Sequence, residues 1–167
     1  MIVVLFRHGH KDFNPSDDPP LSPKGLDQAV KLAENVNNNT LPAPTHCWSS
    51  LKLRTFQTLE KVIQLTNCKS EKITELNVRS YSENNLQFRA RVQKFLNFLD
   101  SKSIKPEHRH EVHFICTHYD WIEEAMTLIQ CDKNLNSFEY ASWSPAQYLV
   151  FELQDQTWHL SQKGVIT

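Results

Sequence analysis

Ile2-Val3-Val4-Leu5-Phe6-Arg7-His8-Gly9 joins an unbroken apolar run to a cation, an imidazole and a glycine. The apolar part, Ile2 to Phe6, predicts a buried strand. Ligands of open α/β sheets bind where the parallel strands end. A guanidinium can hold two phosphate oxygens, and a neutral imidazole nitrogen can attack phosphorus. Arg7 and His8 therefore predict phosphoryl chemistry at this strand end, provided that the rest of the chain supplies partners.

Apolar runs alternate with helical patterns along the whole chain. This alternation predicts an α/β fold with three layers, α/β/α, and a mostly parallel central sheet. The polar, proline-rich segment 12–20 is expected to be a loop that overhangs the site. No repeat or linker divides the sequence, so residues 1–167 are expected to form a single domain. The expected strands are 2–6, 45–49, an extended stretch near 72–76, 112–117, and a hairpin of 147–153 and 157–160; the expected helices are 23–38, 51–65, 86–101 and 120–130.

The composition disfavours several classes of partner. A net charge of −1 lacks the basic excess with which proteins bind many nucleic-acid phosphates. No apolar run approaches the ~20 residues of a membrane helix, and the first residues do not resemble a signal peptide. The four cysteines occur singly and far apart, unlike a metal motif or a disulfide framework. We therefore expect a reduced, cytoplasmic protein without a nucleic-acid or membrane partner.

Three predicted strand ends carry polar side chains that suit one anion. Arg7 and His8 follow the first strand, Ser50 and Arg54 follow the second, and His118 follows the strand at 112–117. Two arginines and two histidines around one point would form a pocket for a phosphate, whose charge is near −2 at pH 7. Phosphoryl transfer mainly needs positioning and charge stabilisation, which such a pocket supplies.

Five segments, in order along nearly the whole chain, resemble motifs of the histidine phosphatase superfamily, also called phosphoglycerate mutase-like. The resemblance implies that family's fold and a metal-independent phosphatase without a cofactor. The segments are Arg7-His8-Gly9 (the RHG signature), Asn14 (the longer RHGxxxxN form), residues 21–29, LSPKGLDQA (LTxxGxxQA), residues 49–58, SSLKLRTFQT (SSxxxRxxQT), and Thr117-His118 (the TH pair).

The same resemblance implies roles for these residues. His8 would attack the phosphate and become transiently phosphorylated, while Arg7, Arg54 and His118 bind the phosphoryl oxygens. Asn14 would add a neutral donor, and Ser50 is a candidate for a hydroxyl contact with the phosphate. Because neighbouring arginines disfavour imidazolium, we expect His8 to be neutral, with its other ring nitrogen donating to a backbone carbonyl.

A leaving alkoxide needs a proton, so a phosphatase acting on esters needs an acid. Glu75 fits the family's LxE position, although Arg79 stands where the family has glycine. Glu83 in the neighbouring loop is a rival, and a third possibility is that neither residue acts. Phosphohistidine phosphatases of the short bacterial type in this superfamily lack the acid. The substrate is therefore a phosphomonoester or a phosphohistidine, carried by a small molecule or a protein.

Two further departures from the family pattern concern the pocket. His10 replaces the acidic residue that often follows RHG, and Tyr119 replaces the glycine that often follows the second histidine. Tyr119 would narrow the pocket or offer a hydroxyl or ring face to the substrate. Only one helix is expected between Glu75 and His118, which leaves little room for the lid of a mutase. Mutase activity is therefore disfavoured.

Other interpretations stay open at this stage. His8 with His10, or His108, His110 and His113, could be metal ligands, but nearby arginines or a solvated linker argue against a bound cation. We treat the tryptophans and cysteines as packing residues and predict no metal site. A different class of function also remains: the pocket could bind a phosphorylated ligand or protein without turnover.

Overall fold

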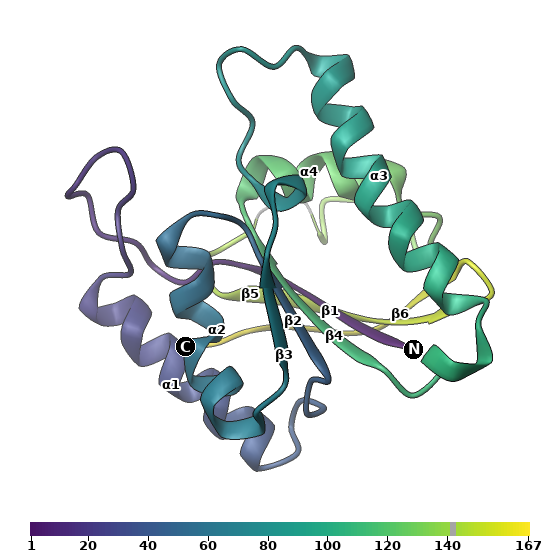
Figure 1. Ribbon diagram of the computed structural model, residues 1–167, viewed down its shortest axis with the longest axis horizontal. Helices are drawn as coiled ribbons and strands as arrows, with labels where there is room; N and C mark the ends of the chain where they lie inside the picture. Colours follow the sequence, from purple (N-terminus) through teal and green to yellow (C-terminus); the bar gives the residue numbers. More distant parts are fainter. Residues whose placement is uncertain (141–142) are drawn as a thin grey trace.

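A six-stranded sheet forms the centre of the computed structural model, which describes residues 1–140 and 143–167 (Figure 1). The strands lie in the order β3-β2-β4-β1-β5-β6. The first four strands in this order pair in parallel, β5 pairs antiparallel with β1, and β6 pairs antiparallel with β5. The predicted mostly parallel sheet is thus confirmed. The strands are Ile2–Arg7 (β1), His46–Ser49 (β2), Lys69–Lys72 (β3), Val112–Thr117 (β4), Gln147–Gln154 (β5) and Thr157–Val165 (β6).

Two helices cover each face of the sheet, which confirms the three layers. In Figure 1, α1 and α2 lie together below the sheet, while α3 and α4 lie above it. Each helix has an apolar stripe whose buried residues pack against the strands. The helices are Pro23–Asn37 (α1), Leu53–Thr66 (α2), Asn85–Ser103 (α3) and Tyr119–Leu128 (α4).

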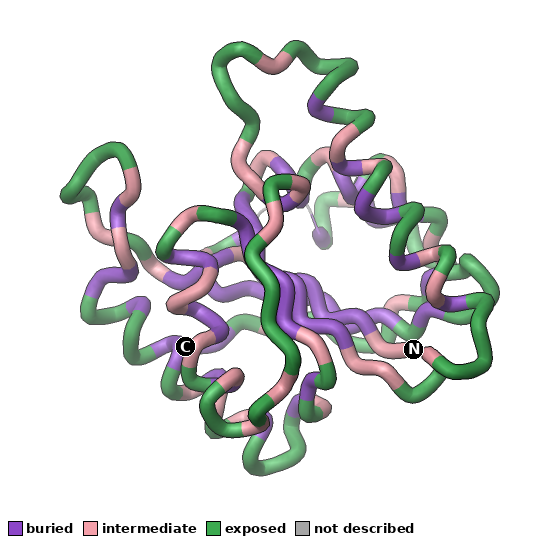
Figure 2. The backbone as a smooth tube through the Cα atoms, viewed as in Figure 1, coloured by how far each residue is buried: buried purple, intermediate pink, exposed green. Residues whose placement is uncertain are grey.

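The continuous apolar character of β1 follows from burial on both of its faces. Val3 and Leu5 belong to the apolar cluster beneath α3 and α4, whereas Val4 and Phe6 belong to the cluster beneath α1 and α2. Figure 2 shows the same burial as a block of purple strands at the centre. Because β1 lies between β4 and β5, its carboxyl end is held from both sides.

Most predicted elements lie within two residues of their expected bounds. There are two exceptions. Near the predicted extended stretch 72–76, the strand β3 ends at Lys72 and Thr74–Leu76 forms a 3-10 helix. β3 is an edge strand with all four residues exposed, so no apolar pattern marks it. β6 also continues to Val165, beyond the predicted residue 160. The segment between α3 and β4 contains a short 3-10 helix at Pro106–His108.

The start of α1 is confirmed in detail. Pro23 occupies the first turn, and the Ser22 hydroxyl accepts a hydrogen bond from the Gly25 N–H. A Cβ atom at Gly25 would lie 2.0 Å from the carbonyl oxygen of His10. Only glycine therefore allows α1 to pack this closely against the segment that follows β1.

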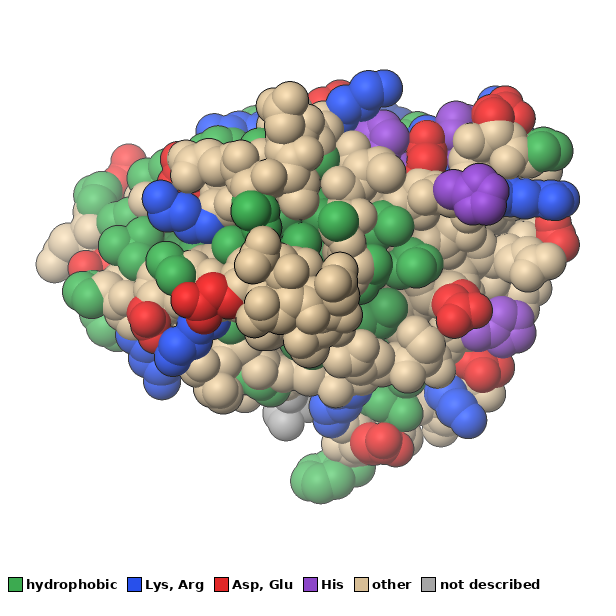
Figure 3. All heavy atoms as spheres, turned by 90° about the horizontal axis from the view of Figure 1, so that it is seen from below, with side chains coloured by type: hydrophobic (Ala, Val, Ile, Leu, Met, Phe, Trp, Pro, Cys, Tyr) green, Lys and Arg blue, Asp and Glu red, His purple; other side chains and the backbone are tan. Residues whose placement is uncertain are grey.

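The surface is mixed in charge where Figure 3 shows it. On this face, basic and acidic side chains are interspersed around hydrophobic ones. Among the described residues, the longest apolar helical stretch falls short of what a bilayer-spanning helix requires.

Candidate active site

Three chain segments bring His8, Arg54 and His118 together at the carboxyl ends of the parallel strands. His8 follows β1, His118 follows the adjacent β4, and Arg54 lies in the first turn of α2 after β2. Arg54 Nε lies 3.2 Å from His8 Nε2, and Arg54 Nη2 lies 3.2 Å from His118 Nδ1. The three residues are at most 8% exposed. Of the two guanidiniums and two imidazoles that the sequence predicts around one point, the fold thus joins Arg54, His8 and His118 by hydrogen bonds.

Backbone contacts fix the position of His8. The His8 N–H donates to the carbonyl of Thr117, at the end of β4. The Gly9 N–H donates to Thr58 Oγ1 on α2, 3.0 Å away, and the Thr58 hydroxyl in turn donates to the carbonyl of Arg54. These bonds join the end of β1 to the helix turn that carries Arg54. They therefore fix the position of the His8 side chain relative to that of Arg54.

The tautomer of His8 follows from its two partners. His8 Nδ1 lies 2.8 Å from the Gly9 carbonyl oxygen, which can only accept, so Nδ1 carries the proton. Nε2 then presents its lone pair toward Arg54. Burial lowers the pKa of His8 to about 3; the Gly9 hydrogen bond opposes this shift, and Arg54 and Arg7 add to it. The result is a neutral imidazole whose unprotonated Nε2 accepts the hydrogen bond from Arg54.

His118 belongs to a hydrogen-bond chain that begins at Arg54. Its Nδ1 accepts from Arg54, so the proton lies on Nε2, which donates to Ser50 Oγ 2.8 Å away. Ser50 Oγ is 2.9 Å from Thr55 Oγ1, which donates to the Lys52 carbonyl. Burial, with help from Arg54, lowers the pKa of His118 to about 2. The imidazole is thus neutral, and the contact with Ser50 fixes its orientation.

Arg7 lies at the edge of this cluster. Its Nη1 donates to the carbonyl of Trp143, and its guanidinium carbon stands 5.4 Å from the centre of the Tyr119 ring. Arg7 Nε is buried without a hydrogen-bond partner among the described residues. Burial lowers the pKa of Arg7, while Tyr119 opposes the shift. The Tyr119 ring therefore packs against Arg7, and the contact with the substrate that we expect from its place after His118 stays a prediction.

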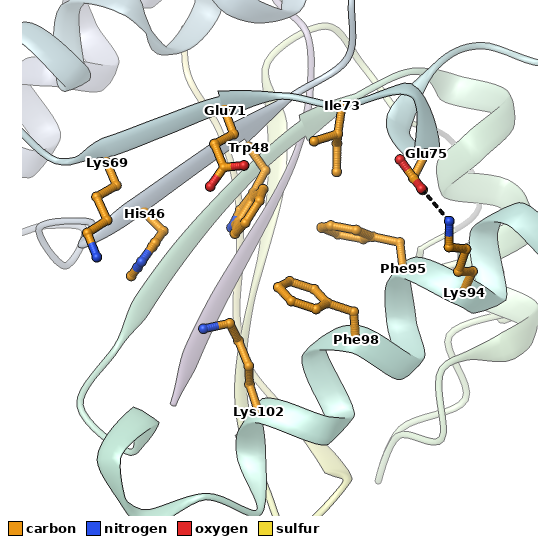
Figure 4. Close-up of a pocket in the computed structure, with 10 residues that line it drawn as sticks. All are labelled: His46, Trp48, Lys69, Glu71, Ile73, Glu75, Lys94, Phe95, Phe98 and Lys102. Atoms are coloured by element: carbon orange, nitrogen blue, oxygen red, sulfur yellow. Dashed lines mark hydrogen bonds and ion pairs between the residues drawn. The ribbon is translucent and has the colours of Figure 1, made fainter.

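Glu75 does not join the histidine cluster. Its Oε1 is 2.7 Å from Lys94 Nζ, and Thr74 Oγ1 donates to its Oε2. The hydrogen bond from Lys94 is the main reason why the pKa of Glu75 is lowered. Figure 4 shows this pair at one end of a cleft of about 520 Å³, with Phe95 beside it. The Glu75 carboxylate is therefore paired with Lys94 in this cleft, and no hydrogen bond joins it to His8, Arg54 or His118 within the described part of the chain. Its role as the acid stays a prediction.

Glu83 is likewise occupied by an arginine. Its two carboxylate oxygens each lie 2.8 Å from a nitrogen of the Arg91 guanidinium. This bidentate contact lowers the pKa of Glu83. Arg91 also donates to the carbonyls of Glu75 and Asn77. Glu83 therefore fastens the segment before α3 to α3 itself.

The loop after β1 contacts Arg54 through Asp18. Asp18 Oδ1 lies 3.8 Å from Arg54 Nη1, and both oxygens accept from the Leu53 N–H at the start of α2. Asn14 is exposed in the same loop, and no hydrogen bond joins its side chain to a described residue. The loop overhangs the site through Asp18, while the phosphate contact of Asn14 stays a prediction.

Asp120 is a residue near the site that the sequence analysis did not single out. Its Oδ2 accepts from the Arg79 N–H at 2.7 Å, and its Oδ1 is buried with no partner among the described residues. Burial lowers the pKa of Arg54, and Asp18 and Asp120 act against that shift. The only sequence signal was an acidic residue in the first turn of the helix after His118.

The described residues contain one cluster with metal-ligand chemistry, and it lies away from this site. His46, Glu111 and His113 place ligand atoms within 4.8 Å of one another. His113 Nδ1 accepts from Trp48 Nε1, and His113 Nε2 contacts Glu111, which also pairs with Lys102 at 3.2 Å. Both ring nitrogens of His113 and the Oε2 atom of Glu111 thus already take part in contacts within the protein, which argues against a metal ion at this cluster. His10 contacts Ser22 Oγ, not His8.

Comparison with known proteins agrees with this geometry. The sequence profile of the histidine phosphatase superfamily (branch 1) matches residues 3–84, which contain the RHG segment and Arg54. This match covers just under half of the chain, from β1 to the residue before α3, and agrees with the resemblance to the histidine phosphatase superfamily that the motifs show. No curated protein matches the chain.

Solved structures show the same fold over nearly the full length. The protein histidine phosphatase SixA complexed with tungstate is 16% identical, with a TM-score of 0.76 over 99% of this chain and 97% of that one. A mycobacterial glucosyl-3-phosphoglycerate phosphatase is 17% identical, with a TM-score of 0.70 over 98% and 99%. A phosphoserine phosphatase from Entamoeba histolytica is 13% identical, with a TM-score of 0.71 over 98% and 96%. The three names differ in substrate, so the shared fold does not select one.

Proposed function

We propose that this protein is a metal-independent phosphatase that forms a covalent phosphohistidine intermediate on His8. The single observation that supports it best is Arg54, which lies 3.2 Å from His8 Nε2 and 3.2 Å from His118 Nδ1. An oxyanion can replace either imidazole as the acceptor for the Arg54 N–H groups. The guanidinium would then hold the phosphoryl group against the lone pair of His8.

The first chemical step needs no base, because His8 is already neutral. Nε2 attacks phosphorus, the P–Nε2 bond forms, and the bond from phosphorus to the leaving group breaks. The ring gains positive charge as this happens, and the Gly9 carbonyl that accepts the Nδ1 proton stabilises it. His118 next to a dianionic phosphoryl group would take up a proton on Nδ1 and become a second cationic contact, because the anion offsets the cost of burying that charge.

Water completes the cycle. It attacks phosphorus from the side opposite Nε2, the P–Nε2 bond breaks, and the products are inorganic phosphate and neutral His8. Ser50 keeps His118 oriented in both steps through its contact with Nε2. Arg7 adds positive charge at the edge of the pocket.

Phosphohistidine is the substrate class that this arrangement favours over a phosphomonoester. An alkoxide leaving group needs a proton at the moment of bond cleavage, whereas a leaving imidazole needs less help. Glu75 is paired with Lys94 and Glu83 with Arg91, and each has a lowered pKa. SixA, a protein histidine phosphatase by name, shares the fold. A mutase lid would need a long insertion between Glu75 and β4. Here α3 fills most of that part of the chain, so little length is left for a lid.

The test compares a phosphohistidine peptide with an aryl phosphate. We expect faster phosphate release from the peptide, complete loss in His8→Ala, and at least half of the activity in the control His10→Gln, whose side chain contacts Ser22. Glu75→Gln should change kcat/KM for both substrates less than threefold. A large selective loss of aryl phosphate hydrolysis in Glu75→Gln would restore this residue as the acid and refute the substrate preference.

The same assay addresses the alternative of a non-catalytic binding protein. Tight binding of inorganic phosphate without release from either substrate would favour that alternative and refute the proposed catalysis.

A further inference from the structure

Two of the four cysteines lie next to each other although 20 residues separate them in the chain. Cys47 is in β2, and Cys68 is in the link between α2 and β3. Their sulfur atoms are 3.5 Å apart. β2 and β3 pair in parallel, His46 with Lys69, so the backbone on both sides of the two thiols is held in place. This proximity is a property of the sheet and not of the sequence spacing.

The two thiols differ in accessibility. Cys47 is buried at 2% exposure, whereas Cys68 is only partly buried and can be reached from solvent. Hydrogen bonding with Cys47 lowers the pKa of Cys68, while the same contact and burial raise that of Cys47. Cys68 is therefore the thiol that reacts first, and Cys47 is the one that attacks afterwards.

We propose that Cys47 and Cys68 form an oxidation site, at which a low-molecular-weight disulfide converts the two thiols into an intramolecular disulfide. The Cys68 thiolate attacks one sulfur of the reagent, forming a mixed disulfide and releasing one reagent thiolate. Cys47 then attacks the Cys68 sulfur, its proton passes to solvent, and the second reagent thiolate leaves. The two protein thiols are oxidised by two electrons, and the reagent disulfide is reduced to two thiols.

The local backbone permits the closure that the bond requires. The sulfurs must approach by about 1.5 Å to reach the usual S–S length of about 2.05 Å. Cys68 lies in a short irregular link after Asn67, whose positive φ of 50° ends α2. Rotation of the Cys68 side chain and a small shift of this link can supply the approach without moving β2.

The cross-link would enclose the segment that carries Ser50 and Arg54 without touching either residue. Closing a loop of this size restricts the unfolded chain, which raises the melting temperature by about 6–12 °C in a domain of this length. The bond lies at the end of α2 opposite to Arg54, so we expect the oxidised form to keep its phosphatase activity. The inference does not depend on the proposed function.

The experiment exposes the full-length protein to oxidised glutathione and follows thiol content, mass and melting temperature. We expect the four free thiols to fall to two, a loss of two hydrogens in mass, a cross-linked peptide containing Cys47 and Cys68, and full reversal by dithiothreitol. Cys68→Ser should abolish the cross-link. Cys131→Ser, which removes a half-buried cysteine near Asp132, is the matched control and should form it normally.

Two results would overturn the proposal. One is the persistence of four free thiols at glutathione potentials that oxidise ordinary protein dithiols. The other is a stable glutathione adduct on Cys68 that never resolves to the internal bond. Both results concern the thiols alone and leave the phosphatase assay unaffected.

Discussion

Acidification should destabilise this protein well before its carboxylates are protonated. Three buried histidines have lowered pKa values in the folded state, about 3 for His8, about 2 for His118 and about 4 for His113, with burial as the main cause. In the unfolded chain each histidine has a pKa near 6.5. Between these limits the unfolded chain binds more protons, so the free energy of unfolding decreases as the pH falls through 6.5.

The magnitude follows from these values. At pH 5.5 each histidine lowers the free energy of unfolding by about 1.4 kcal/mol relative to pH 7.5, so the three together lower it by about 4 kcal/mol. This is a large share of the ~5–15 kcal/mol that stabilises an ordinary domain. Carboxylates with lowered pKa values, such as Glu83 and Glu75, lose their contribution only near and below a pH of about 4.3. The interval from pH 7.5 to 5.5 therefore excludes the carboxylates, and the measurements use protein with Cys68→Ser because the lowered pKa of Cys68, about 6, falls in the same interval.

Urea denaturation at several pH values measures this decrease. In the double variant His8→Gln, His118→Gln the decrease over the same interval should be smaller by about 2.7 kcal/mol, because two of the three contributions of about 1.4 kcal/mol are removed. His159→Gln, which changes an exposed histidine of β6, is the control substitution. A free energy of unfolding that stays constant between pH 7.5 and 5.5, or an unchanged decrease in the double variant, would refute the reasoning.

Further substitutions test the packing and orientation of the site. Ser50→Ala removes the partner of His118 Nε2 and should lower kcat/KM for a phosphohistidine peptide about tenfold, while circular dichroism stays native. Gly25→Ala places a Cβ atom 2.0 Å from the His10 carbonyl and should destabilise the protein by more than about 3 kcal/mol in urea denaturation; a cost below about 1 kcal/mol would contradict the packing at α1. Glu83→Gln breaks a mostly buried bidentate ion pair and should cost about 1–2 kcal/mol by the same measurement, with an unchanged value as the contrary result.

Much of the fold could be predicted because its signals are local. The apolar run of β1 matches a strand buried on both faces, and Ser22-Pro23 matches the start of α1. The meeting of His8, Arg54 and His118 was also predictable, since parallel strands end at one edge of a sheet. β3 could not be predicted in the same way, because an exposed edge strand has no apolar pattern.

The ion pairs of Glu75 and Glu83 are tertiary contacts, which a local sequence pattern does not predict. Lys94 and Arg91 lie on α3, and their reach toward Glu75 and Glu83 depends on how that helix crosses the sheet. The position of Glu75 in the sequence resembles that of the family acid, while its carboxylate is directed toward Lys94. The approach of Cys68 to Cys47 likewise follows from the pairing of β2 with β3.

Trapping the reaction intermediate tests the central claim most directly. The enzyme is mixed with a radiolabelled phosphohistidine peptide, quenched in alkali, digested and analysed by mass spectrometry. We predict an acid-labile, alkali-stable phosphoryl group on the peptide that contains His8, absent in His8→Ala. Phosphate release without any phosphoryl group on His8, or with the label on another residue, would contradict the account.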